Sequence, residues 1–276
     1  MSRRRPLTEM TNDLVVRGGP SRRVLLAALL AAPTAAVAGA VWTTLPLADG
    51  RRLYRAGPAR GRTAFVFFPG ANCDARRYGW LSAMASAGVS VYLLAPAPQP
   101  RFTLCGTADV LAALDAVRPH HRRLLAGGHS AGAAALLDSL DPASAITPRK
   151  DQPQGYTPPQ DVTGLVVMGC SLQPQMLEMV LPGRSEDQPL SRPNDEPMLF
   201  LSGDHDRVAT PELMRKTRER FRAPAELVVI AGGGHYGWVE GREPADRLDF
   251  DQPGTMAPSE QQRITIATLS AWAGWR

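Results

Sequence analysis

Cysteine is scarce in this chain, with 3 residues among 276. Cys73, Cys105 and Cys170 form no C-x-x-C pair and have no histidine cluster beside them. This spacing argues against a disulfide framework and against a zinc site, and no metal is expected. The simplest interpretation is that all three are small, buried apolar residues. A Cys73–Cys105 disulfide stays open as an alternative if the protein leaves the cytoplasm.

The chain also lacks a basic excess once its N-terminus is set aside. The formal net charge is +5, but residues 1–42 hold six arginines against two acids. The rest of the chain is close to neutral, so its charge gives no reason to expect a nucleic-acid partner. Internal repeats are lacking as well. The length that remains after residues 1–42 are set aside fits one α/β domain.

The longest apolar run lies near the N-terminus, from Val24 to Trp42, directly after Arg22 and Arg23. With the small-residue site Ala36-Val37-Ala38, this segment resembles a twin-arginine export signal. It is also barely long enough to span a bilayer. We therefore expect a signal or anchor segment at 1–42 and one folded α/β domain at 43–276. The protein is expected to be exported to the periplasm or beyond. The alternative is that the segment stays uncleaved and anchors the protein in the inner membrane. This segment would then be the protein's contact with the membrane.

In the rest of the chain, short apolar runs alternate with longer helical patterns. Strands are expected over residues 63–68, 89–95, 123–127, 162–168, 197–202 and 225–230, and helices over 75–87, 107–117, 131–140, 210–221 and 259–272. The strands are continuously apolar, which is typical of a parallel sheet covered on both faces. The predicted fold class is α/β, with a mostly parallel central sheet, helices on both faces and an active site at the carboxyl ends of the strands.

A pentapeptide of the form G-x-S-x-G, residues 128–132, joins a predicted strand directly to a predicted helix. A sharp turn in that context exposes the serine hydroxyl, and small flanking residues let the backbone pack closely. The helix N-terminus adds partial positive charge beneath a developing oxyanion. Ser130 is therefore the predicted nucleophile, and an ordinary glycine-rich turn is the alternative.

A serine nucleophile needs a histidine base that a carboxylate orients. The chain has five histidines, and His235 follows the last predicted strand in a glycine-rich loop that would bring its imidazole over the sheet edge. His129 lies inside the turn and points away from the nucleophile, His120 and His121 precede a strand, and His205 adjoins the candidate acids. His235 is the predicted base.

Two candidate acids follow the strand that ends near residue 202. We favour Asp206 over Asp204, and expect the other aspartate to cap the turn or the next helix. The resulting order Ser, Asp, His along the chain is that of α/β-hydrolases.

Two backbone N–H groups are candidates for an oxyanion hole. Ala71 follows the first strong strand in Pro69-Gly70-Ala71, and Ala131 follows the nucleophile. Both positions are where such enzymes supply these donors. The same loop also fits a plain turn with Asp74 as a helix N-cap, and the two interpretations are compatible.

Candidate substrate contacts are Tyr236 and Trp238 beside the base, and Met176 in the 171–196 segment. Packing against the core explains Tyr236 and Trp238 about equally well, and it is the favoured interpretation for Met176. The connection from about 169 to 197 is too short for a cap domain, so we expect short cap loops and an open site.

Five motifs together resemble the α/β-hydrolase superfamily: residues 67–98, GGHSAGAAAL at 127–136, LFLSGDHDRV at 199–208, VVIAGGGHYGW at 228–238 and SEQQRITIATLSAW at 259–272. More narrowly, the chain is similar to bacterial alpha/beta hydrolase fold-5 proteins, a dienelactone-hydrolase-like group. The resemblance implies a triad of Ser130, Asp206 and His235 and no metal or organic cofactor. Two positions depart from the pattern, because Pro69 stands where His is frequent and Gly234 where the narrower group tends to have Asn.

The expected function is hydrolysis of a small acyl ester through an acyl-enzyme on Ser130. Acyl transfer or amide cleavage by the same triad is an alternative within enzymes. A non-catalytic binding or scaffold protein of the cell envelope is the alternative from another class, although it would not require all three triad residues in matching contexts.

Overall fold

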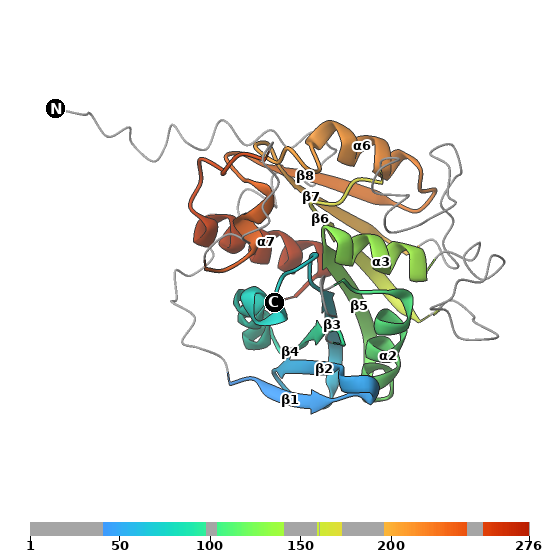
Figure 1. Cartoon of the computed structure of the whole chain (residues 1–276). Helices are drawn as coiled ribbons and strands as arrows, with labels where there is room; N and C mark the ends of the chain where they lie inside the picture. Colours follow the sequence, from blue (N-terminus) through green and yellow to red (C-terminus); the bar gives the residue numbers. More distant parts are fainter. Residues whose placement is uncertain are drawn as a thin grey trace.

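A computed structural model describes residues 41–97, 104–140, 159, 161–172, 196–241 and 251–275. One sheet of eight strands runs through the molecule in the order β1-β2-β4-β3-β5-β6-β7-β8 (Figure 1). The strand bounds are β1 Thr43–Pro46, β2 Arg52–Ala56, β3 Gly61–Phe68, β4 Val89–Ala95, β5 His121–His129, β6 Val162–Met168, β7 Met198–Gly203 and β8 Ala225–Ile230.

Strands β3 to β8 are mutually parallel, as the continuous apolar runs predict. The sequence did not predict β1 and β2, which form an antiparallel hairpin that pairs with β4 at one edge of the sheet. Their residues explain the omission, because β1 is largely exposed and β2 begins and nearly ends with arginine. An edge strand needs no continuous apolar run, so it leaves a weak signal in the sequence.

Helices cover both faces of the sheet (Figure 1). Helices α2, α3 and α6 pack on one face, while η3 and α7 pack on the other. The helix bounds are η3 Ala75–Ala87, α2 Thr107–Val117, α3 Ala131–Ser139, α6 Pro211–Glu219 and α7 Pro258–Ala273, with shorter turns η2 Ala48–Gly50, η4 Arg118–His120 and η5 His235–Trp238. The predicted mostly parallel sheet between two helical layers is confirmed.

The five predicted helices all form, with one difference in type. Segment 75–87 is a 3-10 helix, and its backbone departs from helical geometry at Tyr78, where φ is −107°. Asp74 caps this helix, since its carboxylate accepts the Arg76 N–H at 2.9 Å. Gly88 ends it with φ at 74°, a left-handed conformation that glycine adopts without strain.

The sheet separates two apolar layers, one on each face. The three cysteines belong to these layers, and all are buried thiols outside any disulfide. The interpretation of the cysteines as small apolar residues therefore holds, and the Cys73–Cys105 disulfide does not form. Burial, with Asp206 as the second cause, raises the pKa of the Cys170 thiol to about 12.

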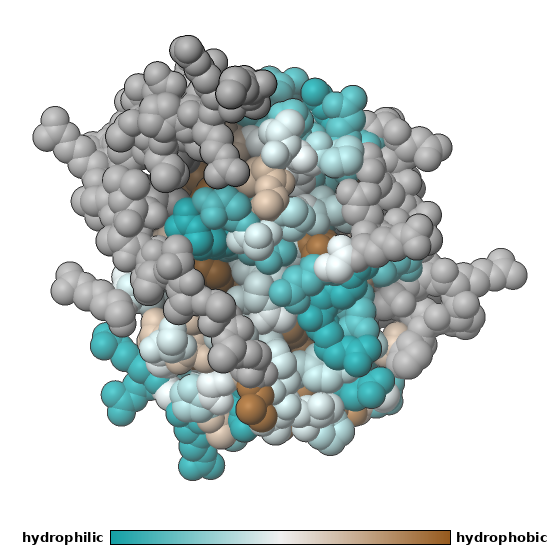
Figure 2. All heavy atoms as spheres, turned by 90° about the vertical axis from the view of Figure 1, so that its left-hand side faces the viewer, coloured by the Kyte–Doolittle hydropathy of each residue, from teal (hydrophilic) through white to brown (hydrophobic). Residues whose placement is uncertain are grey.

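The surface that carries α7 is mixed, with small apolar areas between hydrophilic residues (Figure 2). Across the described ranges, Val41 is the one highly exposed large hydrophobic side chain. The described helices include none with the length and apolar character needed to cross a bilayer. The predicted signal or anchor segment falls almost wholly outside the described residues, as do most of the 171–196 segment and Met176.

Candidate active site

The predicted nucleophile lies on the sharp turn between β5 and α3. Ser130 has φ 52° and ψ −125°, a conformation that residues with a side chain rarely adopt. The turn is held because the Ser130 N–H donates to the Met168 carbonyl at 2.9 Å. A Cβ atom at Gly132 would lie 2.3 Å from the Pro69 carbonyl oxygen, so only glycine lets α3 approach the end of β3 this closely.

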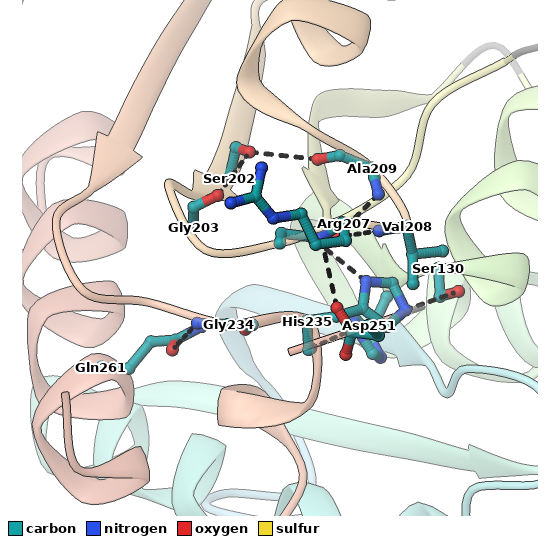
Figure 3. Close-up of polar contacts among 12 residues, drawn as sticks. Ser130, Ser202, Gly203, Arg207, Val208, Ala209, Gly234, His235, Asp251 and Gln261 are labelled. Carbon is teal, nitrogen blue, oxygen red and sulfur yellow. Dashed lines mark hydrogen bonds and ion pairs between the residues drawn. The ribbon is translucent and has the colours of Figure 1, made fainter. Parts of the chain in front are cut away.

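Ser130, His235 and Asp206 form a continuous chain of polar contacts. The Ser130 hydroxyl oxygen lies 3.2 Å from His235 Nε2, and Nδ1 of the same ring lies 3.0 Å from Asp206 Oδ2. Figure 3 shows the serine side chain pointing at the imidazole edge. Ser130 is half-buried, whereas His235 and Asp206 are 2% and 0% exposed. The Ser130 hydroxyl therefore lies at the accessible end of an otherwise buried chain.

Asp206 is fixed by the turn that follows β7. Its Oδ1 accepts the N–H groups of Val208 and Ala209 at 2.9 and 2.7 Å, which leaves Oδ2 for His235. Burial acts to raise the pKa of this carboxyl, but His235 and the bonded amides outweigh it and the pKa is lowered. The carboxylate is thus ionised beside the ring.

The pKa of His235 shifts in the opposite direction to that of Asp206. Burial acts to lower its pKa, but the charge and hydrogen bond of Asp206 outweigh burial and raise the pKa above the usual imidazole value. Asp251, which is 3% exposed, adds to this effect. Because the carboxylate stabilises the imidazolium, the ring is suited to take up a proton from the serine.

Asp204, the other candidate acid, has a different position. It is exposed, and its Oδ1 accepts the Gly232 N–H at 2.6 Å. The Asp204 and His205 N–H groups donate to the carbonyls of Ile230 and Gly233, so the acid turn and the histidine loop are joined by backbone bonds. Asp204 therefore stabilises the turn, as expected of the aspartate that does not face the histidine.

The predicted oxyanion donors lie at the same sheet edge. Strands β3 and β5 are parallel neighbours in which Phe68 pairs with Gly128, so the loop with Ala71 follows beside the turn with Ser130. Ala131 is the first residue of α3, where N–H groups have no acceptor within the helix. The arrangement suits two donors and a helix dipole near the serine.

Helix α7 holds the loop that carries His235. The Gln261 side chain accepts the Gly234 N–H and donates to the Gly234 carbonyl, both at 3.0 Å (Figure 3). A Cβ atom at Gly237 would lie 1.9 Å from Gln261 Oε1, so this loop packs against the amide only because residue 237 is glycine. The Gln261 amide thus fixes the loop at Gly234, the residue just before His235.

Replacing Gln261 by alanine is expected to lower the free energy of unfolding by about 2 kcal/mol, because two buried backbone groups lose their partner. Urea denaturation followed by circular dichroism measures this change. Gln262→Ala is the matched control, since Gln262 makes one bond, from Nε2 to the Gly237 carbonyl at 3.2 Å. Equal losses for the two variants would contradict the role given to the Gln261 pair.

The three residues predicted to contact substrate differ in how the structure places them. Trp238 is 0% exposed, and its Nε1 donates to Thr265 Oγ1 at 2.9 Å. This burial favours the alternative of core packing over a pocket-lining role, because the short helix η5 turns the indole into the layer beneath α7. Tyr236 is partly buried with its ring edge-on to His235, at 5.0 Å between centroids. Met176 lies outside the described residues.

The remaining histidines stay away from the serine. His121 begins β5 and bonds Tyr92, His120 is exposed, and His205 is half-buried near Asp204. His129 is buried and faces away from Ser130, with its Nε2 3.1 Å from the His235 carbonyl oxygen. No cluster of three metal-binding side chains occurs among the residues that the structure describes.

Sequence reasoning missed four residues that support the site: Tyr78, His129, Asp251 and Gln261. Only His129 had a local signal in the sequence, which is its place next to the predicted nucleophile Ser130. The other three approach the site from distant segments, so no pattern along the chain marks them.

Neither the family models nor the curated proteins compared with this chain include a match. Solved structures do match. The apo form of esterase 2 from Thermogutta terrifontis has a TM-score of 0.61 at 18% identity, covering 87% of this chain and 97% of that one. Its butyrate-bound form has a TM-score of 0.57 at 18% identity, covering 84% and 94%. The form phosphorylated by paraoxon has a TM-score of 0.57 at 19% identity, also covering 84% and 94%.

These similarities, together with the sheet order, confirm the predicted α/β-hydrolase fold. They do not bear on the narrower resemblance to the dienelactone-hydrolase-like group. The fold also explains why residues from β5, the turn after β7 and the loop after β8 meet, because parallel strands end at one edge.

Proposed function

We propose that this protein is a serine hydrolase that cleaves small carboxylic esters. The observation that carries the proposal is the chain from Ser130 through His235 to Asp206, with contacts of 3.2 and 3.0 Å, on a strained turn at a helix N-terminus. The strain at Ser130 supports it independently, since such backbone conformations persist mainly at functional sites.

In the proposed mechanism, Ser130 Oγ attacks the acyl carbonyl carbon while His235 Nε2 takes the hydroxyl proton. Asp206 holds the proton on Nδ1 and stabilises the imidazolium. The N–H groups of Ala71 and Ala131 bind the oxyanion, and the imidazolium then donates its proton to the leaving alcohol. Water, deprotonated by the same imidazole, then attacks the acyl-enzyme; the bond to Ser130 Oγ breaks, Oγ takes the proton back from His235, and the acid is released.

Short acyl groups are the proposed substrate range. The structurally similar esterase 2 was solved with butyrate and with propionate bound, and after reaction with paraoxon and sarin. Its fold matches this chain over most of both lengths, and the hydroxyl–imidazole–carboxylate chain supports the same chemistry here.

Treatment with a fluorophosphonate probe is expected to label the protein at one residue, Ser130, because only a serine with an adjacent base reacts quickly. Peptide mass spectrometry identifies the labelled residue, and hydrolysis of p-nitrophenyl acetate and butyrate should fall in proportion to labelling. Heat-denatured protein is the control and should not react. A folded protein that is inert to the probe and to both esters would contradict the proposal and favour a non-catalytic binding role.

A further inference from the structure

A buried tyrosine–histidine pair lies behind the nucleophile turn. His129 is 1% exposed, and its ring centroid lies 5.8 Å from that of Tyr78 and 4.7 Å from that of His235. Tyr78 is 0% exposed, and its hydroxyl oxygen lies 2.8 Å from His129 Nδ1. Neither side chain contacts the serine, so the mechanism above gives them no task.

The hydrogen bonds around this pair have a defined direction. The His235 carbonyl oxygen can only accept, so His129 Nε2, 3.1 Å away, carries the proton. In the neutral ring Nδ1 then accepts from the Tyr78 hydroxyl, and that hydroxyl oxygen accepts the Gly70 N–H at 3.1 Å. An unbroken chain thus runs from the backbone of the oxyanion loop to the backbone of the base.

Both members of the pair keep the protonation state that this chain requires. Burial, with His235 as the second cause, holds the pKa of His129 well below its usual value, so the ring stays neutral. Burial raises the pKa of Tyr78 well above its usual value, so its hydroxyl keeps its proton. The direction of the chain is therefore constant over the pH range in which His235 would titrate.

The helix that carries Tyr78 is fastened to the same loop at further points. Trp80 Nε1 donates to the Trp238 carbonyl at 2.8 Å. The Glu240 N–H donates to the Arg77 carbonyl at 2.8 Å, and Arg77 Nε donates to the Glu240 carbonyl at 2.6 Å. Tyr78 itself lies at the break in η3. Helix η3 therefore joins the segment that follows Ala71 to the segment that follows His235.

We propose that Tyr78 and His129 are positioning residues that set the oxyanion loop and the base in register with each other. The inference rests on the proposed function and deepens it. The donor at Ala71 and the imidazole of His235 act on the same tetrahedral intermediate, and they come from segments more than half the chain apart. A displacement of about 1 Å between such groups can lower a rate about 100-fold, so a rigid connection between their backbones matters.

The first test compares Tyr78→Phe with Tyr92→Phe. The second is a matched control, because the Tyr92 hydroxyl lies 2.9 Å from His121 Nε2 in a pair at the far end of β5. Tyr78→Phe is expected to lower kcat for p-nitrophenyl butyrate about 10-fold to 100-fold with KM within about 3-fold, and Tyr92→Phe to leave both near wild type. Phenylalanine keeps the ring contact with Phe67, at 4.9 Å between centroids.

The second measurement is the pKa of His235, followed by NMR in protein labelled with ¹³C at the histidine Cε1. The charged and titratable groups that face this ring are Asp206, Asp251, His129 and Tyr236. If the loop loosens, the ring moves away from Asp206, whose charge and hydrogen bond are the main causes of the raised His235 pKa. The pKa should therefore fall toward the usual imidazole value in Tyr78→Phe and stay unchanged in Tyr92→Phe. A role in stability alone would leave it unmoved in both.

Two substitutions of His129 provide a third comparison if Tyr78→Phe folds poorly. In His129→Gln the new amide nitrogen reaches about where Nε2 lies, so this variant keeps a donor for the His235 carbonyl. In His129→Asn the shorter amide reaches only about where Nδ1 lies, beside the Tyr78 hydroxyl, so this variant has no donor for the His235 carbonyl. His129→Gln is expected to retain at least about 10-fold more kcat than His129→Asn.

Several results would overturn the inference. They are a folded Tyr78→Phe with wild-type kcat and an unmoved His235 pKa, or equal activity of the two His129 variants. Failure of the proposed function is distinguishable, because wild-type protein would then not react with the fluorophosphonate probe. In that case the NMR comparison still decides whether the pair positions the imidazole.

Discussion

Replacing Ser130 by alanine is expected to lower kcat for p-nitrophenyl butyrate about 10⁶-fold and to abolish fluorophosphonate labelling. The loss is large because the Ser130 oxygen is the atom that would form the acyl-enzyme, and it is the hydroxyl that the His235 ring, 3.2 Å away, would activate. Steady-state kinetics on purified protein measure the effect. The residual rate would come from the oxyanion donors and substrate binding alone.

Ser139→Ala is the matched control for this substitution. Ser139 lies at the other end of α3, is fully buried, and donates only to the Ala135 carbonyl of its own helix at 2.6 Å. Its removal should leave kcat and labelling at wild-type values. If Ser130→Ala folds and keeps more than about one-tenth of the activity, Ser130 is not the nucleophile and the proposed mechanism fails.

Asp206→Asn is expected to lower kcat about 10⁴-fold while leaving the fold intact. The backbone N–H groups of Val208 and Ala209 select an acceptor at Oδ1, so the new amide nitrogen must take the place of Oδ2 and face His235 Nδ1. Because that nitrogen is a donor, the imidazole proton moves to Nε2. The ring then presents a proton to Ser130 and cannot act as a base.

Asp204→Asn separates the two candidate acids. Asp204 accepts a single N–H, from Gly232, and its carboxamide can still do so. Its kcat should fall less than about 10-fold, which is far from the effect at Asp206. The variant pair therefore tests directly the choice between the two aspartates. A larger loss at Asp204 than at Asp206 would reverse the assignment of the acid.

The sheet was predictable because its parallel strands are buried on both faces and consist of continuous apolar runs, such as residues 65–68 of β3. The β1–β2 hairpin was not, because strands near the sheet edge with exposed and charged positions look like loop sequence. The turn that carries Ser130 could also be predicted from local sequence, since the glycines, the serine and the junction between strand and helix lie within five residues.

The supporting contacts could not be predicted, because they join residues far apart in sequence. Tyr78 and His129 are separated by 51 positions, and His129 and the His235 carbonyl by 106. Trp238 shows the same limit from another side: its place near His235 in the sequence suggests a pocket, whereas the turn of η5 points its ring into the core. Side-chain direction on a short helical turn depends on tertiary packing, which residue patterns do not record.

The backbone at Ser130 also bears on how such a chain would change over generations. A left-handed φ of 52° is disfavoured by roughly 1–3 kcal/mol for a residue with a side chain and is accessible to glycine. A chain released from selection for chemistry could therefore relieve this strain by a single substitution at position 130. The serine that stands there keeps the strain, which is what continued selection for a reactive hydroxyl would maintain.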